Sequence, residues 1–142
     1  MSDPAEEIPT GTHPIAGIVH LRSPHPVGDT VHRLTEAIRA AGATLFAVID
    51  HSGEAERVGL SLRDTKLMIF GNPVGGTPVM TAAPLAALDL PLKVLVWQDD
   101  GGVVRISYLD PDWLAARHGL TPDLVAPLSA VRTLVGHMSA PS

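Results

Sequence analysis

The sequence predicts an α+β fold, in which a mixed, largely antiparallel sheet of about five strands carries its helices on one face. Five short runs rich in β-branched and aromatic residues indicate the strands. Segments whose apolar residues recur every three or four positions indicate helices between and after them. Two strand runs flank the loop QDDGG, and an Asp-Gly loop of this kind is typical of a β-hairpin, hence of antiparallel pairing.

The strands are expected at residues 15–21, 43–50, 65–71, 92–97 and 103–109. In the last of them, Arg105 and Ser107 alternate with apolar residues, so this strand should have one polar and one apolar face. Apolar strands also leave the sheet with edges that must be protected. We therefore expect a two-fold homodimer.

The helices are expected at residues 27–42, 52–60, 111–118 and 122–138, with another short one that ends before Ala83. The buried stripe of the first helix is Val27, Val31, Leu34 and Ile38, and that of the last is Leu124, Leu128, Val131 and Val135. Gly42 and Gly119 stand where glycine ends a helix, and Pro127 is a place where the last helix can kink.

Composition limits the number of domains and the kinds of partner. The 142 residues are 45% apolar, which suffices for one domain over residues 15–142. Residues 1–14, MSDPAEEIPTGTHP, have too little apolar content to offset the entropy of ordering, so we expect a flexible tail. Deleting Met1–Thr10 should then leave the melting temperature unchanged within about 2 °C.

Charge and cysteine content exclude several classes of function. The net charge is −5, with 10 basic and 15 acidic residues and no basic cluster, so we expect no nucleic-acid partner. The absence of cysteine excludes disulfides, thiol catalysis and cysteine-ligated metals. Neither a signal peptide nor an apolar run long enough for a membrane span is present, which favours a cytoplasmic protein without a membrane partner.

The stretch LMIFGNPVGGTPVM, Leu67–Met80, resembles the start of a phosphate-binding site, because an apolar strand is followed by a glycine loop. Gly71 and Gly76 have the spacing of a P-loop, but Thr77 follows Gly76 directly. The lysine that would contact the β- and γ-phosphates is missing, which argues against a nucleotide-hydrolysing P-loop. Two interpretations stay open: a structural turn into a short helix, or a helix start whose backbone N–H groups hold a carboxylate or phosphate.

Two long stretches resemble a known family. They are FAVIDHSGEAERVGLSLRDTKLMIFGNPVGGTPVM and LDLPLKVLVWQDDGGVVRISYLDPDWLAARHGL. Over Gly17–Met138 the chain resembles the bacterial and archaeal family named domain of unknown function 302, most densely at IDH, FGNP with GT and M, DLPLKVLVW and RHGL. The resemblance implies a compact α+β domain, compatible with a dimer, and supplies no activity. Pro26 departs from the family, which usually has a serine or similar helix cap there, as does Gln98, where an acidic residue is common.

Two of the seven histidines are candidates for chemistry, because His51 and His118 each lie in a family-like block at the end of an element. Either residue could ligate a metal or a haem, and His51 could act as a general acid or base. None of the histidines has the spacing of a metal motif, however. His118 has a structural alternative, namely an interaction with the carbonyls at the C-terminus of its helix.

The preferred hypothesis is a homodimer that binds a small polar or anionic molecule near the Phe70–Thr77 loop. The expected ligand-binding residues are His51, Asn72, Gly75, Gly76 and Thr77. If the second and third strands run parallel, His51 and Asn72 emerge at the same edge of the sheet, and the glycines form the lip of a crevice. The alternatives are a histidine-ligated metal or haem protein, an enzyme that uses His51, and a non-catalytic structural or interaction module.

Overall fold

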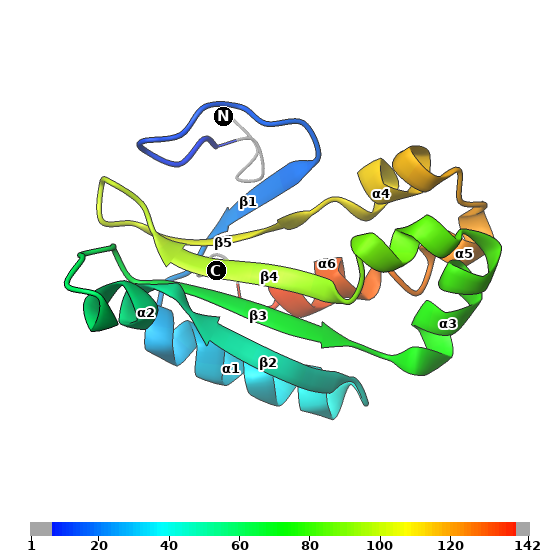
Figure 1. Cartoon of the computed structure of the whole chain (residues 1–142), viewed down its shortest axis with the longest axis horizontal. Helices are drawn as coiled ribbons and strands as arrows, with labels where there is room; N and C mark the ends of the chain where they lie inside the picture. The colour runs from blue at the N-terminus through cyan, green and yellow to red at the C-terminus, as the bar shows by residue number, and fades with distance from the viewer. Residues whose placement is uncertain (1–6, 139–142) are drawn as a thin grey trace.

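The computed structural model describes residues 7–138, which form a five-stranded sheet in the order β1-β5-β4-β3-β2 (Figure 1). The strands are β1 (Ile18–Arg22), β2 (Thr44–Asp50), β3 (Thr65–Gly71), β4 (Leu92–Gln98) and β5 (Val104–Leu109). All four neighbouring pairs are antiparallel. The α+β class is confirmed, and the sheet is antiparallel throughout the described residues rather than mixed.

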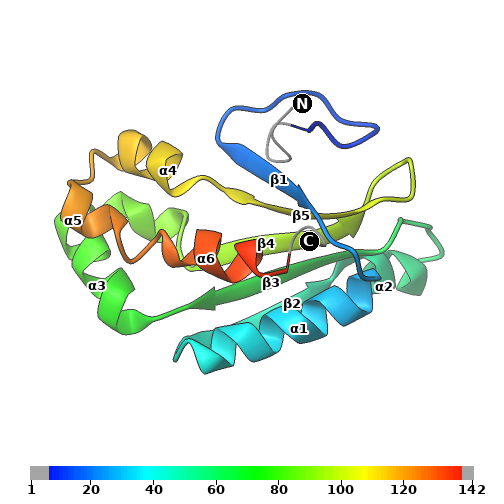
Figure 2. The same ribbon diagram turned by 180° about the vertical axis from the view of Figure 1, so that it is seen from behind.

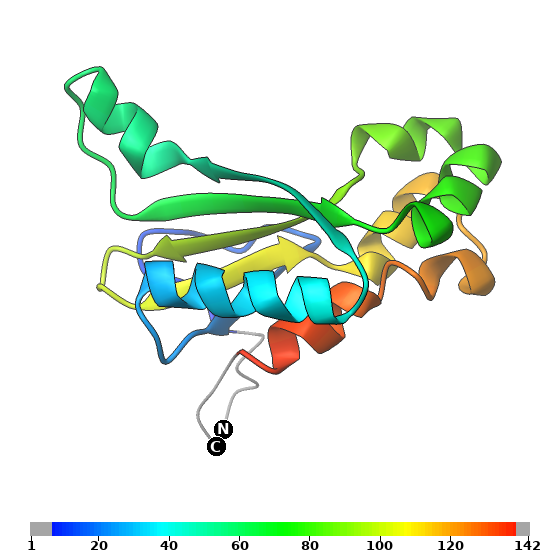
Figure 3. The same cartoon turned by 90° about the horizontal axis from the view of Figure 1, so that it is seen from below.

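The helices are α1 (Val27–Ala40), α2 (His51–Arg57), α3 (Pro73–Ala82), the 3-10 helix η2 (Pro84–Leu88), α4 (Pro111–His118), α5 (Pro122–Val125) and α6 (Ala130–Gly136). α1 and α6 lie against one face of the sheet (Figure 2). α2 and the α3–η2 pair project from the two ends of the sheet on its other side (Figure 3). One face of the sheet is therefore covered by helices along its length, whereas the other carries helices only at its two ends (Figure 3).

The main core lies between the covered face of the sheet and helices α1 and α6. Its fully buried members include Leu34, Ile38, Met68, Phe70, Val94, Val96, Ile106, Val131 and Val135. The predicted stripe of α1 is confirmed, since Val27, Leu34 and Ile38 are buried and Val31 packs against them. Alternate residues of β3, β4 and β5 supply the sheet side of this core, as the period of two requires.

The second and third strands are not parallel, which was the condition for the expected crevice between His51 and Asn72. In the antiparallel pair β2–β3, Thr44 lies opposite Gly71 and Asp50 lies opposite Lys66. A parallel crossover would have to return the chain along the whole strand, about 23 Å for seven residues. The connection instead goes out along helix α2, which spans about 10 Å, and residues 58–64 return beside that helix to the same end of the sheet (Figure 3). The chain instead turns back at the end where β2 finishes.

The predicted last helix, residues 122–138, is two helices. α5 ends at Val125 and α6 begins at Ala130, with Pro127 between them. Proline donates no backbone hydrogen bond and its ring clashes with the carbonyl four residues earlier, so here it interrupts the helix instead of kinking it. The apolar stripe persists across the break, because Leu128, Val131 and Val135 are all buried.

Part of the predicted tail contacts the sheet. Pro9 is buried, and the Thr10 backbone N–H donates to Asp99 Oδ2 at 3.1 Å. The Asp100 N–H donates to the Thr10 carbonyl, also at 3.1 Å. Glu7 pairs with Arg105 through a 3.2 Å contact between Oε1 and Nη2. Residues 7–14 therefore dock on the β4–β5 hairpin, whereas residues 1–6 lie outside the described part of the chain.

Neighbouring hydroxyls support the helix start at Pro26, which lacks a capping side chain. Thr30 Oγ1 donates to the Pro26 carbonyl at 2.9 Å and lies 2.6 Å from Ser23 Oγ. Ser23 Oγ in turn accepts from the His25 N–H at 3.1 Å. The departure from the family pattern at this position is thus accommodated by Ser23 and Thr30.

Candidate functional site

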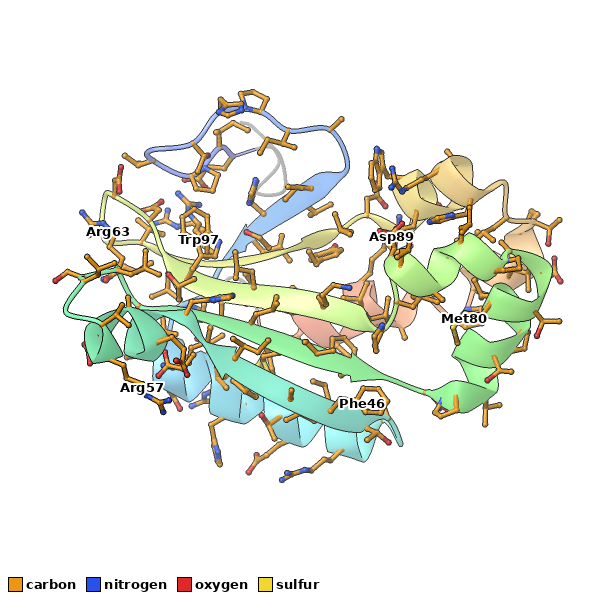
Figure 4. The ribbon with its side chains drawn as sticks, viewed as in Figure 1. Phe46, Arg57, Arg63, Met80, Asp89 and Trp97 are labelled. Atoms are coloured by element: carbon orange, nitrogen blue, oxygen red, sulfur yellow. The ribbon has the colours of Figure 1, made fainter. Side chains whose placement is uncertain are left out.

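A cavity of about 510 Å³ opens at the end of the sheet where β3 runs into α3. Its walls come from the end of α1, the start of β2, the end of β3, the start of β4 and the chain around α3 and α6. The residues that line it include Phe46, Phe70, Met80, Pro91, Pro127 and Leu134. Figure 4 labels Phe46 on β2 and Met80 on α3, which lie at this end of the molecule. Four separate stretches of the chain, residues 41–46, 70–80, 90–92 and 127–134, thus build one site.

The cavity is apolar inside and slightly polar at its rim. Phe70, Leu128 and Leu134 are buried members of its wall. Phe46 and Val74 are exposed, at 53% and 84%. The lining contains no charged side chain, and its polar side chains are those of Asn72 and Thr77. Such a lining suits an uncharged molecule, because a buried ion needs a partner that this wall does not supply.

The glycine loop forms a capped helix start rather than an anion site. Asn72 Oδ1 accepts from the Val74 N–H at 3.0 Å, and the Asn72 carbonyl accepts from Gly75 and Gly76 at 3.1 and 2.9 Å. Pro73, at the first position, has no N–H to offer. The N–H groups expected to hold a carboxylate or phosphate are therefore used within the first turn. The loop is thus a turn into a short helix, and the same loop lines the cavity.

The structure brings four of the five predicted ligand residues together and leaves His51 out. Asn72, Gly75, Gly76 and Thr77 all line the cavity. His51 begins α2 at the opposite end of the β2–β3 pair, where Asp50 faces Lys66. Six residue steps along a strand separate the two ends, or roughly 20 Å. The predicted crevice shared by His51 and Asn72 does not exist, because it required parallel strands.

His118 is held by a carboxylate. Its Nε2 lies 2.5 Å from Asp89 Oδ2, and the same oxygen accepts from Arg117 Nε at 2.9 Å. The hydrogen bond from His118, aided by Arg117, lowers the pKa of Asp89. At the end of α4, Arg117 thus forms an ion pair, and His118 a hydrogen bond, with Asp89 in the chain after η2. Among residues 7–138, no group of three or more His, Cys, Asp or Glu is arranged to hold a metal ion.

A serine–histidine pair joins β1 and β5. Ser107 Oγ is 2.7 Å from His20 Nδ1 and accepts from Trp97 Nε1 at 2.9 Å. Burial lowers the pKa of His20, which favours the neutral ring. At 4% and 8% exposure, however, Ser107 and His20 are closed to a substrate. The pair serves the packing of β1 on β5 and is not a catalytic site.

Sequence reasoning did not find the residues that give the cavity its apolar wall. Phe46, Met80, Pro91 and Leu134 lie in four segments that meet only in the folded chain. Of these four residues, only Met80 and Pro91 lie within the family-like blocks. That placement does not indicate that the two residues share a site.

Curated relatives match most of this chain but only part of their own length. Two proteins named fluoride-specific ion channel, FluC 1 of Brucella suis and FluC 2 of Brucella melitensis, are each 40% identical to it over 105 residues. The match covers 74% of this chain and 41% and 39% of those relatives. The chain thus spans about two fifths of their length. None of the helices described in residues 7–138 is long and apolar enough to cross a membrane.

A solved structure and a family model agree on the fold. The crystal structure of an uncharacterized conserved protein DUF302 from Bacillus stearothermophilus superposes with a TM-score of 0.73 at 17% identity. The superposition covers 88% of this chain and 97% of that one. The model of the family described as domain of unknown function DUF302 matches residues 19–135. The chain therefore belongs to the DUF302 family.

Proposed function

We propose that the chain binds an uncharged, mainly apolar small molecule in the cavity at the Phe70–Thr77 loop. The observation that carries this proposal is the 510 Å³ apolar cavity, whose lining has no charged side chain. Sites for small ligands are typically concave, mostly apolar and of about 300–1,000 Å³. The location is the one expected from the sequence, while the ligand chemistry changes from polar or anionic to apolar.

The rim suggests how such a molecule is oriented. Its apolar body would pack on Phe70, Leu128 and Leu134, which are buried. Asn72 uses its side-chain oxygen in the helix cap. Its amide nitrogen, which bonds to no other described residue, can donate to a carbonyl or ether oxygen of the ligand. The ligand that fits this cavity is therefore an apolar molecule with one hydrogen-bond acceptor at one end.

Dye binding tests this proposal. An uncharged, environment-sensitive dye such as Nile red should gain fluorescence with the wild-type protein and saturate at one site. Ala130→Phe places a phenyl ring at the exposed lining residue of α6 and should abolish most of this signal. Ala126→Phe is the matched control, because Ala126 is exposed but does not line the cavity.

Equal dye binding by wild type and Ala130→Phe would overturn the proposal, provided that both variants keep the wild-type circular dichroism. Native mass spectrometry of freshly purified protein gives a second readout. A retained uncharged molecule, lost in Ala130→Phe, would identify the ligand class.

A second candidate function follows from the curated relatives. Proteins named fluoride-specific ion channel contain a region 40% identical to this chain. The presence of this region in proteins of that name favours a role beside such a channel. The chain would then be an accessory module that contacts a membrane protein.

Co-purification tests the accessory role. The tagged chain would be expressed with a channel of the kind named in those relatives, and membranes would be solubilised in mild detergent. Elution of both proteins in one peak supports the association, and elution in separate peaks contradicts it.

A further inference from the structure

One nitrogen of the Arg105 side chain is buried without a hydrogen-bond partner. The side chain is only 3% exposed, and its Nη1 bonds to no other group within residues 7–138. The other two nitrogens are used, since Nε donates to Asp99 Oδ2 at 2.9 Å and Nη2 donates to Glu7 Oε1 at 3.2 Å. An unpaired buried donor destabilises a native fold, so this one calls for an acceptor.

The two neighbouring carboxylates leave that place open. Asp99 already accepts from Arg105 Nε and from three backbone N–H groups. Glu7 contacts the guanidinium through one oxygen, and its side chain is 38% exposed. Nη1 and Nη2 of an arginine form a fork that fits two oxygens of one carboxylate or phosphate group. Glu7 therefore fills only one half of the fork.

A second arginine faces the first across the β1–β5 pair. Arg22 lies opposite Arg105 in the register, so both side chains leave the sheet on the same side. The Arg22 side chain is exposed and has no hydrogen bond or ion pair with the rest of the described chain. The hydrogen bond from Arg105 lowers the pKa of Glu7, and the charge of Arg22 adds to this effect. Like charges directly opposite each other destabilise a sheet, and an anion between them relieves the repulsion.

We propose that Arg105 and Arg22 form a binding site for the carboxylate or phosphate group of a small molecule, and that Glu7 occupies this site as a displaceable internal ligand. The incoming group would accept from Nη1 and Nη2 of Arg105 together, whereas Glu7 accepts from Nη2 alone. None of these three residues lines the cavity at the Phe70–Thr77 loop. The inference therefore goes beyond the proposed function and does not depend on it.

Glu7 can leave this site without unfolding of the N-terminal segment, which lies beside β1 and β5 (Figure 1). The main-chain bonds that hold the segment to the β4–β5 hairpin are made by Thr10, three residues later. The printed contacts of the Glu7 side chain are with Arg105 alone. Turning this half-exposed side chain into solvent is therefore enough. The gap that it leaves has held a carboxylate, which is one of the two groups proposed to enter.

Thermal unfolding in different anions tests the site. Glu7→Ala removes the internal carboxylate, so acetate or phosphate should raise the melting temperature of this variant by several degrees relative to chloride at equal ionic strength. Wild type should need at least about tenfold more of the same anion, because Glu7 competes for the site. Phosphate also stabilises proteins in general, so the measured quantity is the difference between variant and wild type. The larger response, to acetate or to phosphate, identifies the ligand group.

The matched control is Glu54→Ala, which removes the same charge from an exposed pair with Arg57 on α2. This variant should respond to each anion as wild type does. Nile red binding at the cavity should be unchanged in Glu7→Ala, so failure of this site and failure of the proposed function are distinguishable.

Variants of the two arginines, each combined with Glu7→Ala, complete the test. Arg105→Lys keeps the charge but loses the fork, so the response to acetate and phosphate should disappear. Arg22→Gln changes an exposed residue, should keep the wild-type circular dichroism and should weaken anion binding several-fold. If Arg105→Lys does not fold, the result for Arg22→Gln decides. A Glu7→Ala protein that responds no more than wild type, or a full response that survives Arg22→Gln, would overturn the proposal.

Discussion

At the scale of single residues, the strongest electrostatic feature is the buried pair Arg105–Asp99. Arg105 Nε donates to Asp99 Oδ2 at 2.9 Å, and Asp99 is fully buried. Asp99 also accepts from the N–H groups of Thr10, Gly101 and Val103. Burial alone would raise the pKa of Asp99, but these bonds outweigh it and the pKa is lowered. One carboxylate therefore ties the N-terminal segment to the β4–β5 hairpin.

Asp99→Ala should lower the free energy of unfolding by about 3–5 kcal/mol, because breaking a buried ion pair leaves one charge uncompensated. Arg63→Ala in the exposed pair with Asp100 is the control and should cost about 0–1 kcal/mol. Urea denaturation followed by tryptophan fluorescence measures both. Similar losses in the free energy of unfolding for the two variants would show that burial does not determine how much each ion pair contributes to stability.

Asp50 gives the protein an acid-sensitive helix cap. Hydrogen bonds from the Gly53 N–H, the Ser52 hydroxyl and Lys66 lower its pKa to about 2. A lowered pKa means that the stabilisation is complete above the unfolded value of about 4 and is lost as the pH falls towards the folded value. Asn caps a helix as well as Asp does, but it does not titrate.

Asp50→Asn should therefore flatten the acid limb of the stability curve. The free energy of unfolding of wild type should fall more steeply than that of the variant between about pH 4 and the folded pKa. Urea titrations at several pH values measure the two slopes. Parallel curves would mean that the cap does not contribute to acid sensitivity.

At the scale of elements, α3 packs closely on the break between α5 and α6. A Cβ on Gly75 would lie 2.7 Å from Pro127 Cβ, which is too close for two carbon atoms. A Cβ on the next residue, Gly76, would meet nothing closer than Met80 Cε at 3.8 Å. Gly75 thus lets α3 approach Pro127, and this approach shapes one wall of the cavity.

Gly75→Ala should destabilise the protein by about 1–3 kcal/mol, because α3 or the segment at Pro127 must move. Gly76→Ala is a matched control in the same helix and should stabilise by up to about 1 kcal/mol, since alanine favours helix. Thermal unfolding of the two variants measures the contrast. If Gly75→Ala stabilised the protein, α3 and the segment at Pro127 would be shown to move apart without a loss of stability.

The N-terminal segment is the second element with a testable role. Deleting Met1–Thr10 removes Glu7 from Arg105 and the Thr10 N–H from Asp99, and it also removes the buried Pro9. The melting temperature should fall by several degrees, because about 1 kcal/mol shifts a domain of this size by about 3–5 °C. Deleting only residues 1–6 keeps these contacts and is the control. Equal melting temperatures for all three proteins would restore the expectation of a flexible tail.

At the scale of the whole molecule, patterns within one element could be predicted and relations between elements could not. The strand Thr65–Gly71 and the buried stripe of α1 follow from local periodicity, and the structure has both. The direction of β2 against β3 depends on where α2 leads the chain, which periodicity does not encode. That one error moved His51 from the expected site to the far end of the sheet.

Only the part of the candidate site that lies within one stretch of sequence could be predicted, because relations between elements could not. The glycine loop can be recognised in the sequence, because Gly and Pro cluster there. Its partners Phe46, Pro91 and Leu134 are ordinary apolar residues whose meeting is a tertiary event. Likewise, the composition of residues 7–14 predicts a tail, whereas the bond from Thr10 to a carboxylate 89 positions away holds the segment down.

The strand order also determines when each strand can find its partner while the chain is being synthesised. β1 emerges first from the ribosome, yet its partner in the sheet is β5, where Ile18 meets Leu109. At typical elongation rates, β1 waits on the order of 5–20 s before that partner exists. Through that interval β2, β3 and β4 can pair with one another, while β1 remains unpaired. A nascent chain stopped before Val104 therefore has no strand with which β1 can pair.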